Sequence, residues 1–247
     1  MPASKAALKP RADLTARGFT ERLLALQDDE ELRKIQRYFK SGEGEYGHGD
    51  TFIGVRMGSI FALAREFAEL PPRELEKMLD SDIHEVRVGA LSAMAKQYPL
   101  KTTTDARRKE LYDLYLRRHD RINNWDLVDL AAWHVVGPWL VDKPRAVLHK
   151  LAKSKNMWER RTAVLATFSF IRRGEFDDTL RIVTVLLKDK EDLIHKAAGW
   201  ALRVVGDKDR AVLEAFLDAH AAQMPRAMLS NAIEKFTPAD KAHYRAM

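Results

Sequence analysis

Residues 158–165, Trp158-Glu-Arg-Arg-Thr-Ala-Val-Leu165, decide the fold because variants of this stretch recur along the chain. His84-Glu-Val-Arg-Val-Gly-Ala-Leu91 precedes it, and Ile194-His-Lys-Ala-Ala-Gly-Trp200 follows it. Each copy has a basic residue, then small residues, then apolar ones, at spacings typical of a helix. Each copy is therefore expected to be one helix of a repeated unit.

The spacing between the copies indicates the kind of repeat. Aligning Arg87, Arg161 and Lys196 gives separations of 74 and 35 residues. The larger separation is about two periods of 37 with its midpoint at Asn124, and a weaker copy begins at Arg226. Repeats of this length made from helix pairs are HEAT-like, and small residues let successive helices approach closely. The sequence therefore predicts an all-α, HEAT-like solenoid, an α-α superhelix with a concave inner face.

Helical periodicity continues through nearly the whole chain, without the alternation typical of strands. The expected helices are one or two segments within 19–39, followed by 52–70, 73–80, 84–97, 104–118, 124–136, 144–153, 157–172, 176–188, 191–205, 208–220 and 224–235. Gly137-Pro138 should end or kink the central helix because proline lacks an amide donor. Residues 1–17 are expected to form a flexible tail and residues 18–247 a single repeat domain.

Composition excludes several classes of protein. Apolar residues make up 46% of the 247 residues and charged residues 32%, and no apolar run approaches the roughly 20 residues that span a bilayer. The absence of cysteine excludes disulfides, thiolate catalysis and Cys-ligated zinc. The net charge of +6 is compatible with a polyanionic partner. We expect a monomeric, cytoplasmic protein without a membrane segment.

The usual motifs of phosphate-binding loops, serine hydrolases, zinc proteases and dinucleotide-binding folds are missing. A glycine-rich loop at residues 42–50 contains Glu45, His48 and Asp50, but such an adjacent cluster lacks the spacing of a known cation site. We interpret it as a structural turn. No metal and no cofactor are expected.

Residues 123–129, Asn-Asn-Trp-Asp-Leu-Val-Asp, stand at the midpoint of the repeat pattern. Either Asn123 or Asn124 can cap a helix here, and Asp126 then favours the positive end of the helix dipole. That structural interpretation leaves Asp129 one turn deeper, on the same helix face as Trp125. The pair is therefore a candidate site as well as a candidate helix start.

The repeat pattern predicts that these residues face a shared groove. The second helix of each pair normally lines the concave side, which would align Arg87, Trp125, Asp129, Arg161, Lys196 and Trp200. The segment 142–161 contains seven basic residues and two acidic ones, so this groove is expected to be basic and to bind a phosphate backbone. A charged helix face that is simply solvated is the alternative. Trp133 and Trp139 are assigned to the core.

The chain resembles the AlkD-like DNA alkylation repair proteins, which are HEAT-repeat DNA glycosylases. The resemblance extends from about Tyr38 to Val205. It is carried by Tyr38-Phe-Lys, Gly44-Glu-Tyr-Gly-His-Gly-Asp-Thr-Phe-Ile-Gly-Val-Arg56, Trp125-Asp-Leu-Val-Asp129, Trp158-Glu-Arg-Arg161 and Lys196-Ala-Ala-Gly-Trp200. The family excises cationic N3- and N7-alkylated purines from double-stranded DNA, without a metal and without flipping the base into a pocket.

The resemblance implies roles for individual residues. Asp129 matches the family's catalytic aspartate, and Trp125 and Trp200 match the aromatic walls beside the lesion nucleotide. Arg161 matches a DNA-contacting arginine. The residues that we assign to DNA binding are Arg161, Arg160, Arg56, Lys196 and Lys155.

Two departures from the family pattern concern the shape of the groove. Asn124 stands where some relatives have a second tryptophan, and Gly58 stands where a proline often follows the Gly-Val-Arg segment. The expected activity is that of a monofunctional glycosylase, in which Asp129 stabilises the sugar cation that forms as the base leaves. The alternative is a non-enzymatic repeat scaffold that binds nucleic acid or a protein.

Overall fold

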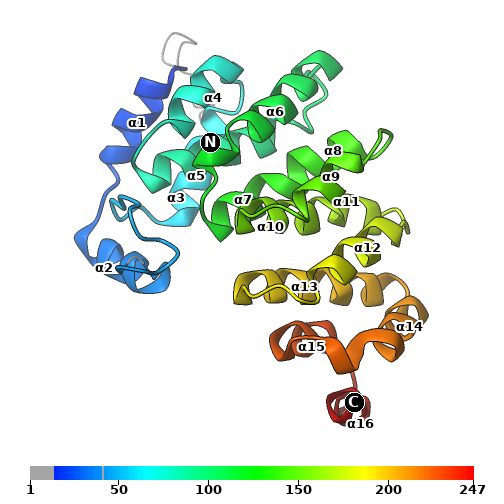
Figure 1. The fold of residues 1–247 in the computed structure, drawn as a ribbon. Helices are drawn as coiled ribbons and strands as arrows, with labels where there is room; N and C mark the ends of the chain where they lie inside the picture. The colour runs from blue at the N-terminus through cyan, green and yellow to red at the C-terminus, as the bar shows by residue number, and fades with distance from the viewer. Residues whose placement is uncertain (1–13, 41) are drawn as a thin grey trace, which may run out of the picture. The chain divides into compact units, whose positions relative to one another are not determined.

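The computed structural model describes residues 14–40 and 42–247. Its contacts divide the chain between Thr103 and Thr104 into two compact units, each of which is described by itself (Figure 1). All regular elements of the described residues are helices, with one isolated bridge between Thr51 and Ile83, so the all-α prediction is confirmed. No helix in this part of the chain is long and apolar enough to cross a bilayer.

The first unit contains five helices among its described residues: α1 (Ala16–Leu24), α2 (Asp29–Tyr38), α3 (Met57–Glu66), α4 (Pro72–Leu79) and α5 (His84–Gln97). Residues 1–13, most of the expected tail, lie outside the described residues, as does Ser41. The helix α1 begins inside the range expected to be a tail, where the Thr15 side chain accepts a hydrogen bond from Gly18 N.

The helix α3 begins at Met57, five residues later than predicted. The Glu85 carboxylate from α5 accepts hydrogen bonds from the amides of Ile53, Gly54 and Val55, at 2.9–3.4 Å for its Oε1. Gly54 has a φ of +79°, a conformation that favours glycine. These contacts hold residues 53–55 outside the helix, a constraint from a residue 30 positions away.

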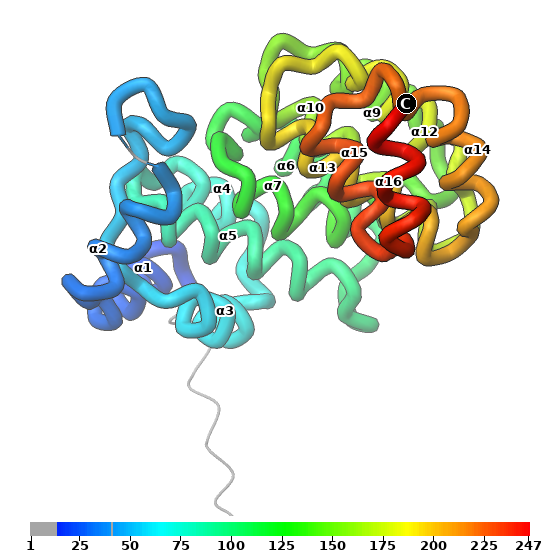
Figure 2. The backbone as a smooth tube through the Cα atoms, turned by 90° about the horizontal axis from the view of Figure 1, so that it is seen from below, coloured from blue at the N-terminus to red at the C-terminus, as the bar shows by residue number. Residues whose placement is uncertain are grey.

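The second unit begins with α6 (Asp105–Arg117) and ends with α16 (Pro238–Ala246), which was not predicted (Figures 1 and 2). Between them lie α7 (Trp125–Ala131), α8 (Gly137–Leu140), α9 (Ala146–Leu151), α10 (Met157–Ala166), α11 (Phe168–Ile171), α12 (Asp177–Leu186), α13 (Asp192–Lys208), α14 (Arg210–His220) and α15 (Arg226–Ala232). Neighbouring elements pack in chain order, α7 on α10, α10 on α13, and α13 on α15. The repeated helix pairs are thus confirmed.

The repeat register differs from the predicted alignment by one residue. Arg87, Arg160 and His195 each follow their helix N-cap by four residues. Each side chain bonds the main-chain oxygen six residues earlier, at 2.8, 2.9 and 2.7 Å respectively. Arg87 therefore corresponds to Arg160 and not to Arg161, although Arg161 and Lys196 do correspond to each other. The sequence alignment missed this because Arg160 and Arg161 are adjacent.

Two glycines allow close approach between elements of the second unit. A Cβ atom at Gly199 on α13 would meet the Met228 carbonyl oxygen of α15. A Cβ atom at Gly137 would meet the Ala166 carbonyl oxygen and the Ser169 side chain. Small residues thus set the spacing of the helices here, as the repeat pattern predicted.

The helical run does not end at Gly137-Pro138, although its regular α-helical pattern is interrupted just before this pair. A π-helical segment, Ala132–Val136, follows α7 directly and leads into α8. Pro138 has no amide hydrogen, and the wider π turn accommodates that missing donor. The His134 ring contacts the Leu130 carbonyl oxygen through Nδ1 at 3.0 Å, which helps satisfy the altered ladder.

Candidate functional site

The candidate site is built on α7, whose first residue is Trp125. The buried Asn124 caps the helix, and its Oδ1 accepts a hydrogen bond from Trp125 N at 2.8 Å. The Asp126 carboxylate accepts one from Leu127 N at 2.8 Å. These two side chains perform the capping that the sequence indicated. Asp129 lies one turn further on and takes no part in the cap.

Asp129 forms a bidentate ion pair with Arg161 of α10. Arg161 donates from Nε to Oδ1 at 2.7 Å and from Nη2 to Oδ2 at 2.8 Å, and its Nη1 donates to the Leu193 carbonyl oxygen at 2.7 Å. The Asp129 side chain is 23% exposed, whereas that of Arg161 is 7% exposed. The Arg161 side chain is therefore the more buried partner, and the Asp129 side chain is partly exposed.

Burial governs the titration of this carboxyl. Loss of solvation raises the pKa of Asp129 above its ordinary value, and the nearby Asp126 adds to the rise. The Arg161 guanidinium opposes the rise through its hydrogen bonds and its charge. Arg161 thus favours the ionised carboxylate in a position that would otherwise favour the protonated one.

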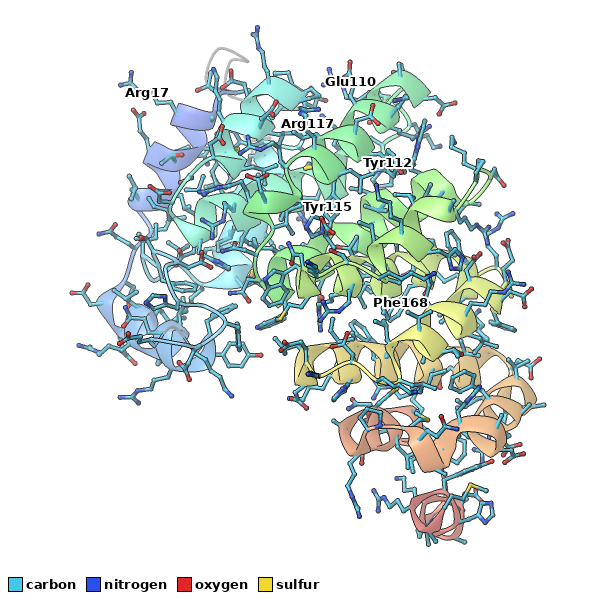
Figure 3. All side chains as sticks on the ribbon, in the orientation of Figure 1. Arg17, Glu110, Tyr112, Tyr115, Arg117 and Phe168 are labelled. Carbon is cyan, nitrogen blue, oxygen red and sulfur yellow. The ribbon has the colours of Figure 1, made fainter. Side chains whose placement is uncertain are left out.

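Trp200 of α13 belongs to a cluster of three aromatic rings. Its ring centroid lies 4.8 Å from that of Phe168 at an interplanar angle of 89°, and 6.0 Å from that of Trp133 at 65°. Phe168, the first residue of α11 and labelled in Figure 3, is buried, whereas Trp133 and Trp200 are partly exposed. Trp133 was assigned to the core, and sequence reasoning missed its place in this cluster.

A buried polar network supports the Arg161 side of the site. The Tyr115 hydroxyl and the Thr162 hydroxyl are 2.8 Å apart, and the His119 Nε2 lies 2.9 Å from the same Thr162 oxygen. Burial raises the pKa of Tyr115 and lowers the pKa of His119, so both side chains are neutral at pH 7. Figure 3 labels Tyr115 on α6. The network joins α6 to the residue that follows Arg161.

The other residues assigned to DNA binding differ in their exposure and in how strongly they are paired with carboxylates. Arg160 donates to both Asp189 oxygens, at 2.6 and 3.1 Å, and is largely committed to that pair. Lys155 is exposed, and Lys196 is 55% exposed with a surface partner in Asp192. Such a surface ion pair contributes little energy, so Lys196 could exchange it for a phosphate.

Arg56 and Arg87 belong to the first unit. Arg56 is 69% exposed and contacts Glu31 at 2.9 Å. Arg87 is buried, where it binds the Asp50 carboxylate that also contacts His84. The basic groove that would align these residues with the second unit stays a prediction.

The glycine-rich loop shows how Asp50 is used. Its carboxylate binds the side chains of Arg87 and His84, and Glu45 accepts a hydrogen bond from Gly42 N. Among residues 14–40 and 42–247, no group of three or more His, Asp or Glu side chains could hold a metal ion. The structural interpretation of the loop agrees with these contacts.

The chain is similar to known proteins over most of its length. The sequence model of the family described as "DNA alkylation repair enzyme" matches residues 19–236. A solved structure, described as a predicted DNA alkylation repair enzyme from Enterococcus faecalis, has a similar fold with a TM-score of 0.65 and 16% sequence identity. The match covers 86% of this chain and 97% of that one. A comparison with curated proteins finds no match. Because the family model spans far more than half of the residues, the chain belongs to the DNA alkylation repair enzyme family.

Proposed function

We propose that the protein is a monofunctional DNA glycosylase that releases cationic N3- and N7-alkylated purines from double-stranded DNA. The observation that carries the proposal is the Asp129 side chain, which is 23% exposed and whose carboxylate is held by the buried guanidinium of Arg161. A fixed negative charge that reaches the surface can stabilise a positive charge that develops on a bound ligand.

The reaction is balanced without a cofactor or a metal. An alkylated purine with a formal positive charge leaves with the electron pair of its bond to C1′ and becomes a neutral free base. The deoxyribose then carries oxocarbenium character. Water adds to C1′ and loses a proton, which leaves an abasic site. Asp129 stabilises the sugar cation and orients the water, while Trp125 and Trp200 flank the nucleotide.

The charges around Asp129 argue against acid catalysis. Asp129 must be ionised to stabilise a cation, and its partner Arg161 does not lose its proton in proteins. His119 has a lowered pKa and bonds Thr162, so it is a poor proton donor at pH 7. The substrate itself must therefore supply the activation of the leaving base.

The test is single-turnover excision with purified protein. Duplexes that contain N7-methylguanine or N3-methyladenine should lose the free base, whereas duplexes with uracil, 8-oxoguanine or hypoxanthine should not. Chromatography of the released base and alkaline cleavage at the abasic site measure the two products. DNA that is bound but never loses a base would refute the glycosylase and favour a binding scaffold. Release of a neutral base would reveal a proton donor that this mechanism lacks.

We further propose that the protein works as an intracellular monomer and that Arg161, Arg160, Arg56, Lys196 and Lys155 contribute to DNA binding. Support for the last point comes from exposure. Lys155, Lys196 and Arg56 extend into solvent. Arg161 and Arg160 are tied to carboxylates and would contribute chiefly through the elements that they hold in place.

A further inference from the structure

We infer that Glu85 is a positioning residue for DNA binding, whose buried carboxylate fixes the main chain beside Arg56 and so presents the exposed Arg56 guanidinium to a phosphate. The inference rests on the proposed function, in which Arg56 contacts DNA. All the residues that carry it belong to the first unit.

The first step concerns the main chain that leads to Arg56. The Oε1 atom of Glu85 accepts hydrogen bonds from the amides of residues 53, 54 and 55, at 3.0, 2.9 and 3.4 Å in chain order. Glu85 is 2% exposed, and Val55, the residue before Arg56, is 1% exposed. Successive amides directed at one anion form a nest, and hydrogen bonds to a charged acceptor are stronger than neutral ones. The carboxylate therefore fixes the three residues that end at Arg56.

The same segment is held at two further points. The Thr51 carbonyl oxygen accepts a hydrogen bond from His84 N at 2.8 Å, so the start of the segment is bound to the beginning of α5. The Gly54 carbonyl oxygen accepts one from Asp28 N at 3.1 Å, and a Cβ atom at Gly54 would meet the Asp28 carbonyl oxygen. The conformation of the segment is thus set by contacts with both α5 and the N-cap of α2.

The second step concerns the Arg56 side chain itself. Arg56 is the N-cap of α3, but its side chain makes no capping hydrogen bond. The side chain is 69% exposed, and its Nη2 donates to Glu31 at 2.9 Å. Within residues 14–40 and 42–247, the other guanidinium donors of Arg56 have no hydrogen-bond partner. A fixed main chain therefore carries a cation whose remaining donors are open to solvent.

The third step concerns the free energy of binding. A phosphate that binds an arginine on a loose segment must first order that segment, and a segment held in advance avoids this cost. The ion pair between Arg56 and Glu31 lies at the surface and contributes little, so a phosphate can replace Glu31. Glu85 is too deeply buried to touch DNA and acts through Arg56.

The sign of the expected effect separates positioning from simple electrostatics. Removing a carboxylate makes the protein more positive, which by itself strengthens binding to a polyanion. If Glu85 positions Arg56, its removal weakens binding instead. A loss of affinity on removing this negative charge is therefore the characteristic result.

The experiment measures binding of the full chain to an unmodified duplex by fluorescence anisotropy, at several salt concentrations and well below the melting temperature of each variant. The variants are Arg56→Gln, Glu85→Ala, Glu85→Gln and the double variant Arg56→Gln/Glu85→Ala. Glu74→Ala is the matched control, because Glu74 is 7% exposed and also accepts a hydrogen bond from a main-chain amide, Ala16 N at 2.9 Å. Hydrogen exchange of the amides at 53–55 reports directly on the segment. Release of N7-methylguanine by the wild type is measured in parallel.

Arg56→Gln should weaken binding by about 3- to 10-fold near 0.1 M salt and reduce the slope of log affinity against log salt by about 0.9, as expected for one lost phosphate contact. Glu85→Ala should lower affinity and slope in the same way and speed exchange of the amides at 53–55. Glu85→Gln keeps one acceptor oxygen and should weaken binding measurably but less. The double variant should bind like Arg56→Gln, because a residue that acts only through Arg56 has no effect once Arg56 is gone. Glu74→Ala should leave the slope unchanged.

The slope distinguishes positioning from general damage, because unfolded protein lowers the active fraction without changing the number of phosphate contacts. Unchanged or tighter binding by Glu85→Ala, a further loss in the double variant, or an equal loss of slope in Glu74→Ala would overturn the inference. If Glu85→Ala fails to fold, Glu85→Gln decides, and a wild-type affinity and slope in that variant refute the role of Glu85.

The same measurements separate this inference from the proposed function. Wild-type protein that binds the duplex without releasing N7-methylguanine would refute the glycosylase. Arg56→Gln with wild-type affinity would remove Arg56 from the interface and the role of Glu85 with it. Normal release of N7-methylguanine, a weakened Arg56→Gln and an unaffected Glu85→Ala would refute only the role of Glu85.

Discussion

Replacing Asp129 with asparagine tests the proposed chemistry most directly, and the structure sets its expected size. A carboxylate about 4 Å from a unit positive charge contributes roughly 4 kcal/mol at an effective dielectric of about 20. Arg161 lies behind the carboxylate, because its side chain is 7% exposed and that of Asp129 is 23% exposed. At about 8 Å from the sugar, its charge opposes the carboxylate by roughly 2 kcal/mol. The pair therefore stabilises the transition state by a net of about 2 kcal/mol.

Asp129→Asn removes the favourable charge and leaves the opposing one. The electrostatic stabilisation of the transition state therefore falls by about 4 kcal/mol, which slows single-turnover excision by about three decades. In the double variant Asp129→Asn/Arg161→Gln neither charge remains. This variant should recover about 2 kcal/mol of the loss, or roughly 30-fold in rate. A double variant that is faster than the single one is the characteristic result of an opposing charge.

The same change affects folding, so it needs a control. Removing Asp129 leaves the buried Arg161 without its carboxylate, which costs on the order of 3–5 kcal/mol of stability. Asp189→Asn provides the match, because Asp189 makes a similar bidentate pair with Arg160 and its side chain is 5% exposed. It should lower the melting temperature without slowing excision at saturating DNA. Equal excision by Asp129→Asn and the wild type would refute the electrostatic role of Asp129.

Three further predictions concern binding and stability. Lys155→Gln should weaken binding to all duplexes and reduce the slope of log affinity against log salt by about 0.9, measured by titration at several salt concentrations; an unchanged slope would remove Lys155 from the interface. Gly199→Ala should cost about 2 kcal/mol or more in denaturant unfolding because its Cβ meets the Met228 backbone, whereas Gly58→Ala, with open space around it, should stabilise by about 0.5 kcal/mol. Burial lowers the pKa of His119 in the folded protein, so the stability that the neutral side chain contributes is complete above the unfolded pKa of about 6.5 and is lost as the pH falls through the folded pKa. His119→Gln should therefore flatten the decline in melting temperature below pH 6.5.

The sequence predicted those features that depend on local patterns. The predicted bounds of 84–97 match α5, His84–Gln97, a helix whose residues are nearly all buried. The start of α3 was wrong because Glu85, distant in sequence, binds the amides of residues 53–55. The repeat register was wrong by one residue because two adjacent arginines fit one position in the sequence. Their distances from the helix N-cap and the bond from Arg160 to the Ser154 carbonyl oxygen distinguish them in the structure. A tertiary contact decided each of these two points.

The candidate site was predictable to a similar extent. The spacing of Trp125 and Asp129 marked the helix, and the repeat pattern placed Arg161 and Trp200 with them. The resemblance then implied a role for each of these residues. The sequence could not show that three nitrogen atoms of Arg161 donate hydrogen bonds to the Asp129 carboxylate and the Leu193 carbonyl oxygen. Arg161 was interpreted as a phosphate ligand because its acidic partner, Asp129, lies 32 positions away in the sequence. Its contact with DNA stays a prediction, now beside a second role in positioning and ionising Asp129.

That second role explains why a catalytic carboxylate would be paired at all. An unpaired Asp129 would act on the sugar with its whole charge, but burial raises its pKa, and without Arg161 a larger fraction would be protonated and inactive. Arg161 lowers the electrostatic stabilisation of the sugar cation by about half, but it keeps Asp129 ionised. Arg161→Gln should therefore shift the acid limb of the excision rate to higher pH, since the ionised form is the active one and its pKa rises further. At a pH above that limb, the variant should excise at least as fast as the wild type when DNA is saturating, because the opposing charge is gone. A profile that falls equally at every pH would show that Arg161 does not act by setting the charge of Asp129.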